Sequence, residues 1–539
     1  MSSFEDQDVN LPRMLIEQCR KRGNAIKIAD STGVKLSGND LLIRSLVLGK
    51  ILAKHVLKAD EKYVGVLLPP SVPAAVANFA LSFQKRVAVN LNYTVSSATL
   101  NQCIEMAGIK HVLTSRKVLD KLDVKLDAEV VYLEDFRDKA SLLDKVSGFV
   151  WGKLAPISML LSHLGLSSVD AKEPVTIIFT SGSTGIPKGV VLSYGNVASN
   201  VHAIRDAIGL SERDVILGIL PFFHSFGYTV TLWTAMALPP TGVFHYSPLD
   251  AKQIGKLSEQ YKATVLLATP TFLRNYMRRV TPDQFKTLEV VVVGAEKMPI
   301  SVADEFEKTF GIRPLEGYGT TELSPLVSVN LPPKRSTATD PGKGLREGSV
   351  GRPVPGVQAR IVDLDDRHVL GVNESGMLEI KGPNVMQGYL HQEELTRKVI
   401  RDGWYETGDI AMIDEDGYIH ITGRQSRFSK IGGEMVPHIQ LEEAIHKILG
   451  IGEDGKVPAV VTAVPDPKKG ERLIVLHTGL GMSASDLLKK LSGEGLPNLF
   501  LPGEDSFLQV DEIPVLGTGK LDLKGMQTVA LAHFGPEKT

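Results

Sequence analysis

A chain of 539 residues is too long for a single hydrophobic core and predicts roughly three or four structural units. Its hydrophobic content of 43% and charged content of 23% exclude a disordered or fibrous protein, and a formal net charge of -2 provides no overall basic surface for nucleic acid. Cys19 and Cys103 are the only cysteines, which excludes a disulfide framework or a zinc ribbon and suits a reducing cytosol.

The first 150 residues contain short apolar runs that are typical of buried strands. They are "YVGVLLP" at 63–69, "RVAVNLN" at 86–92 and "KHVLTS" at 110–115. The opening "MSSFEDQDVNLPRML" is acidic and lacks the charged-then-apolar pattern of a secretion signal. We therefore expect a cytoplasmic protein.

The most apolar window of the chain lies at 147–166. It carries Lys153, Pro156 and His163 and falls short of the ~20 uninterrupted apolar residues that a membrane span requires. We predict a buried or surface helix here. The alternative is that the segment touches lipid at the inner face of a membrane or admits an apolar substrate.

Between 174 and 310, β-branched runs alternate with segments of helical periodicity. The runs are "PVTIIFT", "DVILGIL", "ATVLLAT" and "LEVVVVG", and the helical segments include 250–260 and 301–309. Alternation of this kind predicts an α/β fold, with a mainly parallel sheet covered by helices on both faces.

From about residue 346 the pattern changes to that of β-hairpins. "GMLEIKG", "GWYETGDIAMID" and "EDGYIHITG" predict strands, and Asp416-Gly417 is a typical tight-turn pair. After Arg424 the helical segment "IQLEEAIHKILG" ends at Gly450. We predict a large domain at 1–424 with a β-rich subdomain at about 346–424, and a small α+β domain at 425–539.

The stretch "TSGSTGIPKG" at 180–189 directly follows a predicted buried strand. Glycines let consecutive backbone N–H groups line a concavity that attracts an anion, and Ser, Thr and Lys188 add donors and charge. The order of Gly182, Gly185, Lys188 and Gly189 does not fit a P-loop, and neither GxGxxG nor GxSxG is present. Alone, such a loop is as typical of a flexible surface turn as of a polyphosphate site.

Six further blocks follow this loop in order. They are "PFFHSFGYT" at 221–229, "VVVGAEK" at 291–297, "EGYGTTELSP" at 316–325, "YETGD" at 405–409, "ITGR" at 421–424 and "LGTGKLD" at 516–522. The ordered set resembles the adenylate-forming superfamily, which includes acyl-CoA synthetases, amino-acid-activating adenylation domains and firefly luciferase. The resemblance implies an AMP-binding adenylation domain at 1–424 and a mobile C-terminal lid domain at 425–539.

Within that superfamily the chain is most similar to the acyl-[acyl-carrier-protein] synthetase part of the bifunctional 2-acylglycerophosphoethanolamine acyltransferase. The blocks that carry this likeness are "LPFFHSFGYTVTL", "EGYGTTELSPLVSVN", "KGPNVMQGYL", "RFSKIGGEMV", "IPVLGTGKLD" and "AVNLNYT". The likeness implies that the enzyme first makes a fatty acyl-AMP from ATP, releasing pyrophosphate. The acyl group then passes to the phosphopantetheine thiol of acyl carrier protein.

The resemblance also implies a set of nucleotide-binding residues. These are Thr180, Ser181, Gly182, Ser183, Thr184, Gly185, Lys188, Gly294, Ala295, Glu296, Tyr318, Gly319, Thr320, Thr321, Asp409, Ile421, Arg424 and Lys520. In the family the first loop holds the phosphates, the stretch after "VVV" contacts adenine, and Tyr318 would stack on the base. Asp409 and Arg424 match the ribose-binding positions. Taken singly, Tyr318 is more typical of a core aromatic, and the pair of Asp409 and Arg424 is more typical of a surface ion pair.

Five residues are implied to act in catalysis: Lys520, Thr184, Glu322, His224 and Lys430. Glu322 would hold Mg²⁺ with Thr184, because this hard ion prefers oxygen ligands. Lys520 matches the lysine that reaches the α-phosphate and the acyl carboxylate. In similar enzymes the lid then rotates and brings the loop with Lys430, Gly432 and Gly433 to the same centre. Many relatives carry Asp or Lys at the pivot where this chain has Ser426.

The acyl side is implied by Phe222, Phe223, His224 and Phe226, which resemble the block that lines the acyl entrance. "FFHSFGYTV" has no acidic residue to receive an ammonium group, so a fatty acid is favoured over an amino acid. Coenzyme A remains the alternative acceptor, as in a long-chain acyl-CoA synthetase, and a fatty-acyl-AMP ligase would use neither. A luciferase-like oxidoreductase and a nucleotide-binding regulator without turnover are the more distant alternatives.

Overall fold

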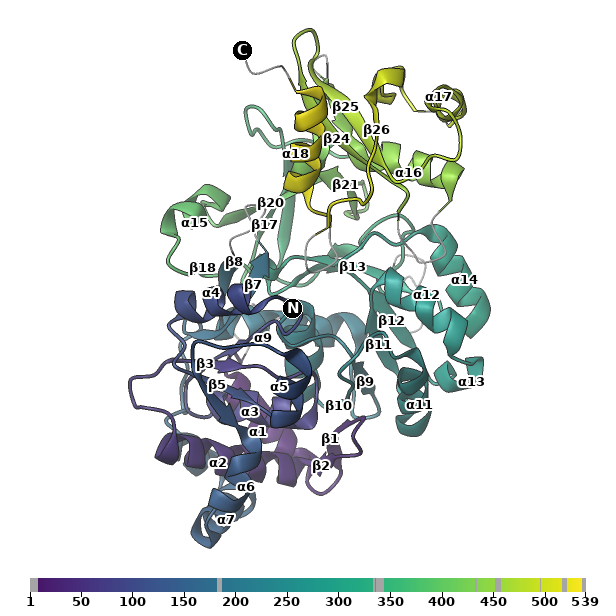
Figure 1. Cartoon of the computed structure of the whole chain (residues 1–539). Helices are drawn as coiled ribbons and strands as arrows, with labels where there is room; N and C mark the ends of the chain where they lie inside the picture. Colours follow the sequence, from purple (N-terminus) through teal and green to yellow (C-terminus); the bar gives the residue numbers. More distant parts are fainter. Residues whose placement is uncertain are drawn as a thin grey trace.

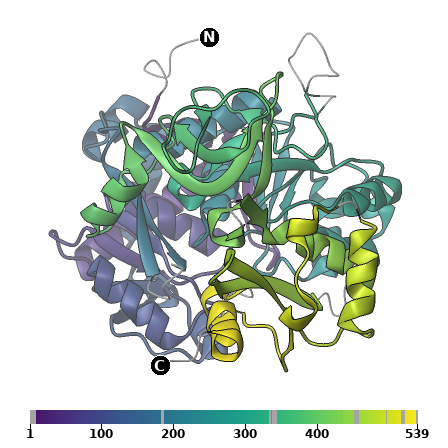
Figure 2. The ribbon, with the colours of Figure 1, turned by 90° about the horizontal axis from the view of Figure 1, so that it is seen from above.

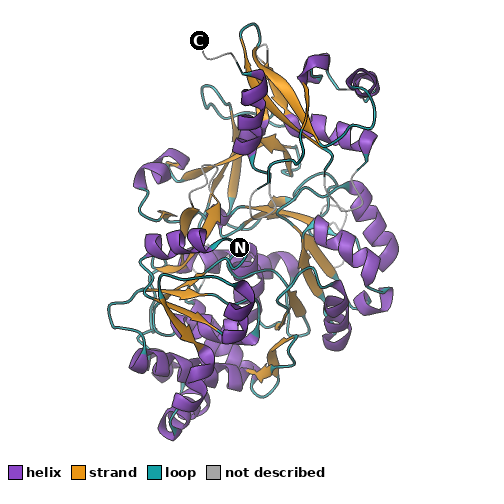
Figure 3. Ribbon diagram, viewed as in Figure 1, coloured by secondary structure: helices purple, strands orange, loops and turns teal. Residues whose placement is uncertain are grey.

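The protein is described by a computed structural model of the whole chain (Figure 1). The described residues are 8–181, 187–332, 335, 344–431, 434–450, 457–494, 496–515 and 521–535. They form four β-sheets, and helices flank the strands throughout (Figure 3). The expected α/β architecture with a large N-terminal part and a smaller C-terminal unit is confirmed.

The first sheet has seven strands in the order β18-β8-β7-β4-β3-β5-β6. They are β3 (Tyr63–Val66), β4 (Val87–Asn90), β5 (His111–Thr114), β6 (Glu129–Tyr132), β7 (Pro174–Ser181), β8 (Pro187–Ser193) and β18 (Gly388–Tyr389). The strands from β7 to β6 run parallel, whereas β8 pairs antiparallel with both β7 and β18. The predicted runs near 63, 86, 110 and 174 are therefore strands of one sheet.

The second sheet has nine strands in the order β15-β14-β13-β12-β11-β9-β10-β1-β2. They are β1 (Ile26–Asp30), β2 (Lys35–Ser37), β9 (Val215–Gly218), β10 (Thr241–Phe244), β11 (Val265–Ala268), β12 (Val290–Val293), β13 (Leu315–Gly319), β14 (Leu326–Val329) and β15 (Arg352–Pro353). The central strands, from β1 to β13, are parallel, and the outer pairs are antiparallel. Every residue of β10, β11 and β12 is buried, as continuous apolar runs predict.

Helices cover both faces of these sheets. They are α1 (Leu11–Arg22), α2 (Gly38–His55), α3 (Val72–Ser82), α4 (Ser97–Ala107), α5 (Arg116–Leu122), α6 (Phe136–Lys139), α9 (Tyr194–Ile208), α10 (Thr234–Ala237), α11 (Ala251–Tyr261), α12 (Pro270–Arg279), α13 (Pro282–Phe285) and α14 (Ile300–Phe310). In α4, Leu100, Cys103, Ile104 and Ala107 form one apolar stripe at helical spacing, which packs on the first sheet. On the opposite side of that sheet, α3 and α9 join the main core.

A third, antiparallel sheet follows in the chain. Its strands are β16 (Gln358–Val362), β17 (Gly376–Lys381), β19 (Ile400–Arg401), β20 (Trp404–Ile413) and β21 (Ile419–Arg424), with α15 (Glu393–Val399) before β19. The predicted turn at Asp416-Gly417 joins β20 to β21, and Gly417 has a φ of 81°, where glycine is favoured. The hairpin pattern read from about residue 346 is thus confirmed as strands and turns.

The C-terminal unit is built on a sheet of its own. Its strands are β22 (Phe428–Ile431), β23 (Glu434–Pro437), β24 (Ala459–Asp466), β25 (Gly470–His477) and β26 (Phe507–Gln509), and its helices are α16 (His438–Leu449), α17 (Ala484–Ser492) and α18 (Leu523–Phe534). One face of β24 and β25 packs on α16 and α17, and the other packs on α18. The predicted helix end at Gly450 is confirmed as the cap of α16. Figure 2 shows this unit, in yellow-green to yellow, beside teal segments of the N-terminal part.

The apolar window at 147–166 is not one helix. The structure divides it among α7 (Leu142–Phe149), the π-helix η3 (Val150–Leu154) and α8 (Ile157–His163), with the break just before Pro156. Proline lacks the N–H that would continue the ladder, which explains the break. Across the described residues, no helix combines the length and the apolar character needed to cross a bilayer.

Candidate active site

Tyr318 and Asp409, which are 91 residues apart in sequence, meet between the second and third sheets. Tyr318, in β13, donates its hydroxyl hydrogen to Oδ2 of Asp409, in β20. Arg424, in β21, lies opposite Asp409 in the strand ladder and donates from Nε to Oδ1 at 2.8 Å. Both oxygens of a carboxylate that is only 2% exposed are therefore held by side chains that the sequence analysis assigned to one nucleotide site.

The electrostatics of this trio favour one protonation state. Burial, reinforced by Asp409, raises the pKa of Tyr318 well above its ordinary value, so the phenol remains a donor. The negative charge of Asp409 raises the pKa of Arg424. The group thus presents a fixed carboxylate, a neutral phenol and a cation at neutral pH.

Gly294 brings a third segment to the same place. A Cβ atom built at Gly294 would lie 3.3 Å from the carbonyl oxygen of Gly317 and 3.4 Å from a ring carbon of Phe226. The backbone after β12 therefore lies against β13 and against the start of the π-helix η4 (Phe226–Trp233). Ala295 has a φ of 68°, and the carboxylate of Glu296 accepts hydrogen bonds at Thr271, at the start of α12. Glu296 thus directs its side chain to α12.

The residues that follow β13 contain two threonines in contact with the site. The hydroxyl oxygens of Thr321 and the buried Ser225 are 3.3 Å apart and share a hydrogen bond. This bond joins the segment after β13 to the start of η4. The neighbouring Thr320 has a buried hydroxyl with no hydrogen-bond partner among the described residues. A buried polar atom of this kind is unfavourable unless a ligand satisfies it, so the position fits a phosphate-binding role.

Glu322 and Lys188 both contact Tyr389, in β18. The Tyr389 hydroxyl donates to Oε1 of Glu322 at 2.9 Å, and Nζ of Lys188 lies 5.3 Å from the centre of the Tyr389 ring. Burial, followed by the charge of Glu322, raises the pKa of Tyr389, so this phenol is also a permanent donor. Lys188 is paired with Thr180 across the β7–β8 hairpin, and Ser181 ends β7. The two ends of the glycine-rich stretch therefore lie in antiparallel strands.

The predicted acyl block precedes and begins η4. Phe222 is fully buried against Phe244, and Phe223 stands edge-on to Tyr93 with ring centres 4.9 Å apart. The backbone N–H of Phe226 donates to Nδ1 of His224 at 3.3 Å, which orients the imidazole ring. The block is thus aromatic around one oriented histidine.

The profile of the family described as "AMP-binding enzyme" matches residues 15–390, which is more than half of the chain. The chain belongs to the AMP-binding enzyme family. Luciferin 4-monooxygenase of Nipponoluciola cruciata is 28% identical over 96% of this chain and 93% of that protein. The long-chain-fatty-acid–CoA ligase of Thermus thermophilus is 32% identical over 66% of each chain.

A solved structure gives the same result. ATP-bound MatB from Rhodopseudomonas palustris superposes with a TM-score of 0.77 and is 26% identical, covering 97% of this chain and 100% of that one. The resemblance to the adenylate-forming superfamily is therefore confirmed, and so is an enzyme of the AMP-forming ligase type.

Several nucleotide-binding and lid-loop residues predicted from sequence lie outside the described residues. They are Gly182, Ser183, Thr184, Gly185, Gly432, Gly433 and Lys520. For Lys430 and Ser426 the backbone is described, in β22 and in the short helix η7 (Gln425–Arg427), but not the side chain. Gly319 ends β13, and Ile421 lies in β21 beside Ala411. Their assigned roles remain predictions.

The C-terminal unit contacts the N-terminal part beside the predicted adenine segment. Nζ of Lys297, three residues after Gly294, lies 2.7 Å from the carboxylate of Glu443 in α16. Within the unit, the buried Arg427 pairs with the buried Glu442 of α16, whose carboxylate also accepts the N–H of Val461. Arg424 is therefore bound to the N-terminal part and Arg427 to the C-terminal unit, which leaves 425 and 426 between the two anchors.

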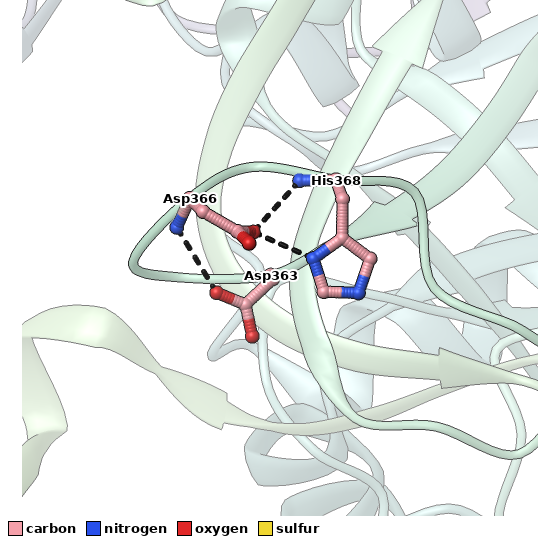
Figure 4. Close-up of side chains that lie close together, drawn as sticks. All are labelled: Asp363, Asp366 and His368. Atoms are coloured by element: carbon pink, nitrogen blue, oxygen red, sulfur yellow. Dashed lines mark hydrogen bonds and ion pairs between the residues drawn. The ribbon is translucent and has the colours of Figure 1, made fainter.

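A group of residue types that can ligate a metal lies in the exposed turn after β16. Asp363, Asp366 and His368 bring their ligand atoms within 4.8 Å of one another (Figure 4). The Asp363 carboxylate accepts hydrogen bonds from the backbone N–H groups of residues 365 and 366. The Asp366 carboxylate forms hydrogen bonds with the backbone N–H and with the ring Nδ1 of His368. These bonds close the turn on itself, and the group is separate from Glu322, the predicted magnesium ligand of this AMP-binding enzyme.

The sequence analysis did not assign roles to Tyr389 and Ser225. Both lie inside quoted blocks, "KGPNVMQGYL" and "PFFHSFGYT", so the signal was present in the sequence. Residue type alone does not separate either of them from the other tyrosines and serines of the chain. Their contacts with Glu322 and Thr321 became visible only when the strands and η4 were brought together.

Proposed function

We propose that the protein activates a fatty acid with ATP as fatty acyl-AMP and then transfers the acyl group to the phosphopantetheine thiol of acyl carrier protein. In the first step a carboxylate oxygen attacks the α-phosphorus, the bond to the bridging oxygen breaks, and pyrophosphate leaves. In the second step the sulfur attacks the acyl carbon, AMP leaves with the electron pair, and the thiol proton goes to solvent.

The observation that carries the proposal is the convergence of distant segments on Asp409. Its buried carboxylate is held by Tyr318 and Arg424, and Tyr318 adjoins the glycine whose carbonyl faces Gly294. A pre-oriented carboxylate suits the two hydroxyls of a ribose, because its oxygens accept several hydrogen bonds. The adjoining Tyr318 ring and the glycine backbone at Gly294 and Gly317 suit a flat base beside it.

The phosphate side of the proposal uses Lys188, Thr320, Thr321 and the segment around 180–189. Phosphoryl transfer needs positioning and neutralisation of charge more than covalent chemistry from the protein. Glu322, with Thr184, would hold Mg²⁺, which when bound neutralises phosphate charge. The donor set fits this hard ion, since Glu322 is a carboxylate that Tyr389 holds by a single hydrogen bond. Lys520 would reach the α-phosphate and the acyl carboxylate in the first step, and Lys430 would replace it in the second.

A fatty acid is proposed because the acyl block is apolar. Phe222, Phe223 and Phe226 flank His224 in the sequence, and "FFHSFGYTV" contains no acidic side chain. An amino acid would bring an ammonium group that needs a partner when buried. The name of the Thermus thermophilus relative, a long-chain-fatty-acid–CoA ligase, supports the same substrate class.

The acceptor distinguishes the lead proposal from a second candidate. Sequence likeness of the six blocks favours acyl carrier protein, whereas the name of the Thermus thermophilus relative favours coenzyme A. Both acceptors end in the same thiol, so the reacting residues are common to the two. Lys468 and Lys469 lie in an exposed turn of the C-terminal unit and would face an acidic carrier protein.

The test is to supply ATP, Mg²⁺ and a fatty acid with either holo-acyl carrier protein or coenzyme A, and to detect the acylated product by mass. Acylated carrier protein is the expected product. Exclusive acyl-CoA would establish the second candidate, and pyrophosphate exchange without either thioester would indicate a fatty-acyl-AMP ligase. Light emission or oxygen consumption would instead indicate the luciferase-like oxidoreductase. ATP binding without pyrophosphate release would indicate a nucleotide-binding regulator.

The proposed location is the cytoplasm, with peripheral contact at the inner face of the membrane. Cys19 and Cys103 are free and buried, which fits a reducing compartment. Fatty acids partition into bilayers because their chains are apolar, so an enzyme that acts on them gains from a contact with the leaflet. Large apolar side chains are exposed between 142 and 159.

A further inference from the structure

We infer that one face of α7 and η3 is a docking surface for an anionic phospholipid bilayer. The α7 apolar face is defined by Leu142, Leu143, Val146, Phe149, Val150 and Leu154. Their exposed fractions run from 41% to 79%. The inference deepens the proposed peripheral location by naming the surface, and it does not depend on the proposed reaction.

The orientation of this helix is the reverse of that expected for a surface helix. An amphipathic helix normally turns its large apolar side chains to the core and its small and polar ones to water. Here Gly148 and Gly152 face α2: a Cβ atom at Gly148 would lie 2.4 Å from a methyl of Val47, and one at Gly152 would lie 2.7 Å from Ile43. Packing against the body therefore uses glycines and leaves the leucines outside.

The only acidic side chain of the segment also faces inward. Asp144 is 4% exposed and lies 3.2 Å from Nζ of Lys50 in α2. Its carboxylate also accepts the backbone N–H of Ser141, and the Ser141 hydroxyl oxygen accepts the backbone N–H of Asp144, which closes a capping box at the start of α7. The outward face therefore carries no carboxylate between residues 139 and 163.

The exposed charges of the same segment are positive. Lys139, Lys145 and Lys153 are all exposed, against a net charge of -2 for the whole chain. Nζ of Lys153 lies over the Phe149 ring, 5.5 Å from its centre, so this positive charge lies directly beside the α7 apolar face. Apolar side chains interleaved with lysines match the acyl boundary and the anionic headgroups of a membrane surface.

Charge also decides between a bilayer and a second copy of the chain. A two-fold interface places the same patch on both subunits. Two copies joined through the α7 apolar face would bring Lys145 and Lys153 of both chains into one interface that lacks carboxylates, which repulsion disfavours. An anionic leaflet has the complementary sign.

The position of α7 allows such contact. Figure 1 shows α7 at the lower end of the molecule, at the opposite end from β24, β25 and α18. Exposed patches of this kind on a protein surface commonly mark a protein or membrane contact. A flat surface can therefore meet this end without reaching the C-terminal unit.

The experiment is sedimentation of the full chain with vesicles of phosphatidylcholine alone or mixed with phosphatidylglycerol. We expect binding to the mixed vesicles that weakens as salt is added. The double variant Leu143→Ser/Leu154→Ser should lower binding at least about tenfold, because two apolar side chains that would enter the bilayer are lost. Lys145→Glu/Lys153→Glu should lower binding to mixed vesicles specifically.

The matched control is Leu249→Ser, because Leu249 is 63% exposed, like Leu154 at 64%, but lies in a different segment. It should bind as the wild type does. A second readout uses Val146→Cys with a polarity-sensitive fluorophore, which should shift to the blue with mixed vesicles. Selective labelling is expected because Cys19 and Cys103 are buried, and burial raises the pKa of each to about 12.

Three outcomes would overturn the inference. The first is a wild-type chain that sediments with neither vesicle and gives no fluorescence shift. The second is an equal loss of binding in Leu249→Ser. The third is a wild-type dimer that Leu143→Ser/Leu154→Ser dissociates in size-exclusion chromatography, which would make the occupant a second copy. Pyrophosphate exchange measured without vesicles should be the same in all these variants, so the proposed reaction is tested separately.

Discussion

Tyr318→Phe is the change that tests the proposed nucleotide site most directly. It removes one hydroxyl and retains the aromatic ring that is proposed to stack on the base. In the wild type this hydroxyl donates to the buried carboxylate of Asp409, whose other oxygen accepts from Arg424 at 2.8 Å. The variant therefore loosens the carboxylate on one side only.

The expected size of the effect follows from that geometry. A hydrogen bond to a charged group contributes about 1.5–3 kcal/mol, which corresponds to about 10- to 100-fold in an equilibrium constant. Arg424 still orients Asp409, so we expect the low end, an increase of about tenfold in the KM for ATP. Burial raises the pKa of Tyr318 well above its ordinary value, so the effect should not change across the neutral pH range.

The assay is exchange of labelled pyrophosphate into ATP, measured as a function of ATP concentration. Tyr276→Phe is the matched control, because the buried Tyr276 donates its hydroxyl hydrogen to a backbone carbonyl of Pro248 at 2.7 Å. That control should lower the melting temperature without changing the KM for ATP. An unchanged KM in Tyr318→Phe, or an equal rise in the control, would refute the ribose-binding role of the trio.

Three further predictions follow from other contacts. Tyr389→Phe should raise the Mg²⁺ concentration needed for half-maximal pyrophosphate exchange by up to about tenfold, because Glu322 loses its orienting donor; an unchanged magnesium requirement would contradict this. Lys27 is fully buried, and burial lowers its pKa to about 7, so the unfolded chain binds more protons above that pH and stability should rise with pH. Urea unfolding should show that the free energy of unfolding of the wild type rises relative to that of Lys27→Met, by at most about 1.4 kcal/mol per pH unit between about pH 7 and pH 9. A difference between the two proteins that does not change with pH would be evidence against this. Lys297→Glu should change the ratio of adenylate formation to thiol transfer by less than about fivefold, because the ion pair of Lys297 with Glu443 is exposed. The charge-swapped variant Lys297→Glu/Glu443→Lys should restore the ratio. A double variant whose ratio is no closer to wild type than that of the single variant would count against a role for the pair.

Local patterns in the sequence determined most of the strands and the family. Continuous β-branched runs such as "VVVV" at 290–293 can be buried on both faces only in a helix-covered sheet, and they do form such strands. The turn at Asp416-Gly417 and the helix end at Gly450 depend on backbone conformations that few residues favour. The residue types at these positions were therefore sufficient to predict the turn and the helix end. The antiparallel pairing of β7 with β8 was not predicted, because a glycine-rich loop alone does not specify strand direction.

The site itself was only partly predictable. Motif order identified Tyr318, Asp409 and Arg424, but the hydrogen bonds that join them depend on how two sheets meet. The prediction of one helix at 147–166 was wrong, because the helical segment that ends at Leu154 and the helix that begins at Ile157 are separated at Pro156. Tyr389 has an ordinary residue type, and only its contacts with Glu322 and Lys188 distinguish it from other tyrosines.

The sequence by itself determined that this chain is an adenylate-forming enzyme with apolar strands under helices, because residue type and local spacing are enough for both. Only the tertiary structure decided which side of α7 faces outward. Periodicity separates Leu143 and Leu154 from Gly148 and Gly152 but does not say which set meets the core. Close contact with α2 excludes a Cβ atom at both glycines, so the glycines lie inside and the leucines outside.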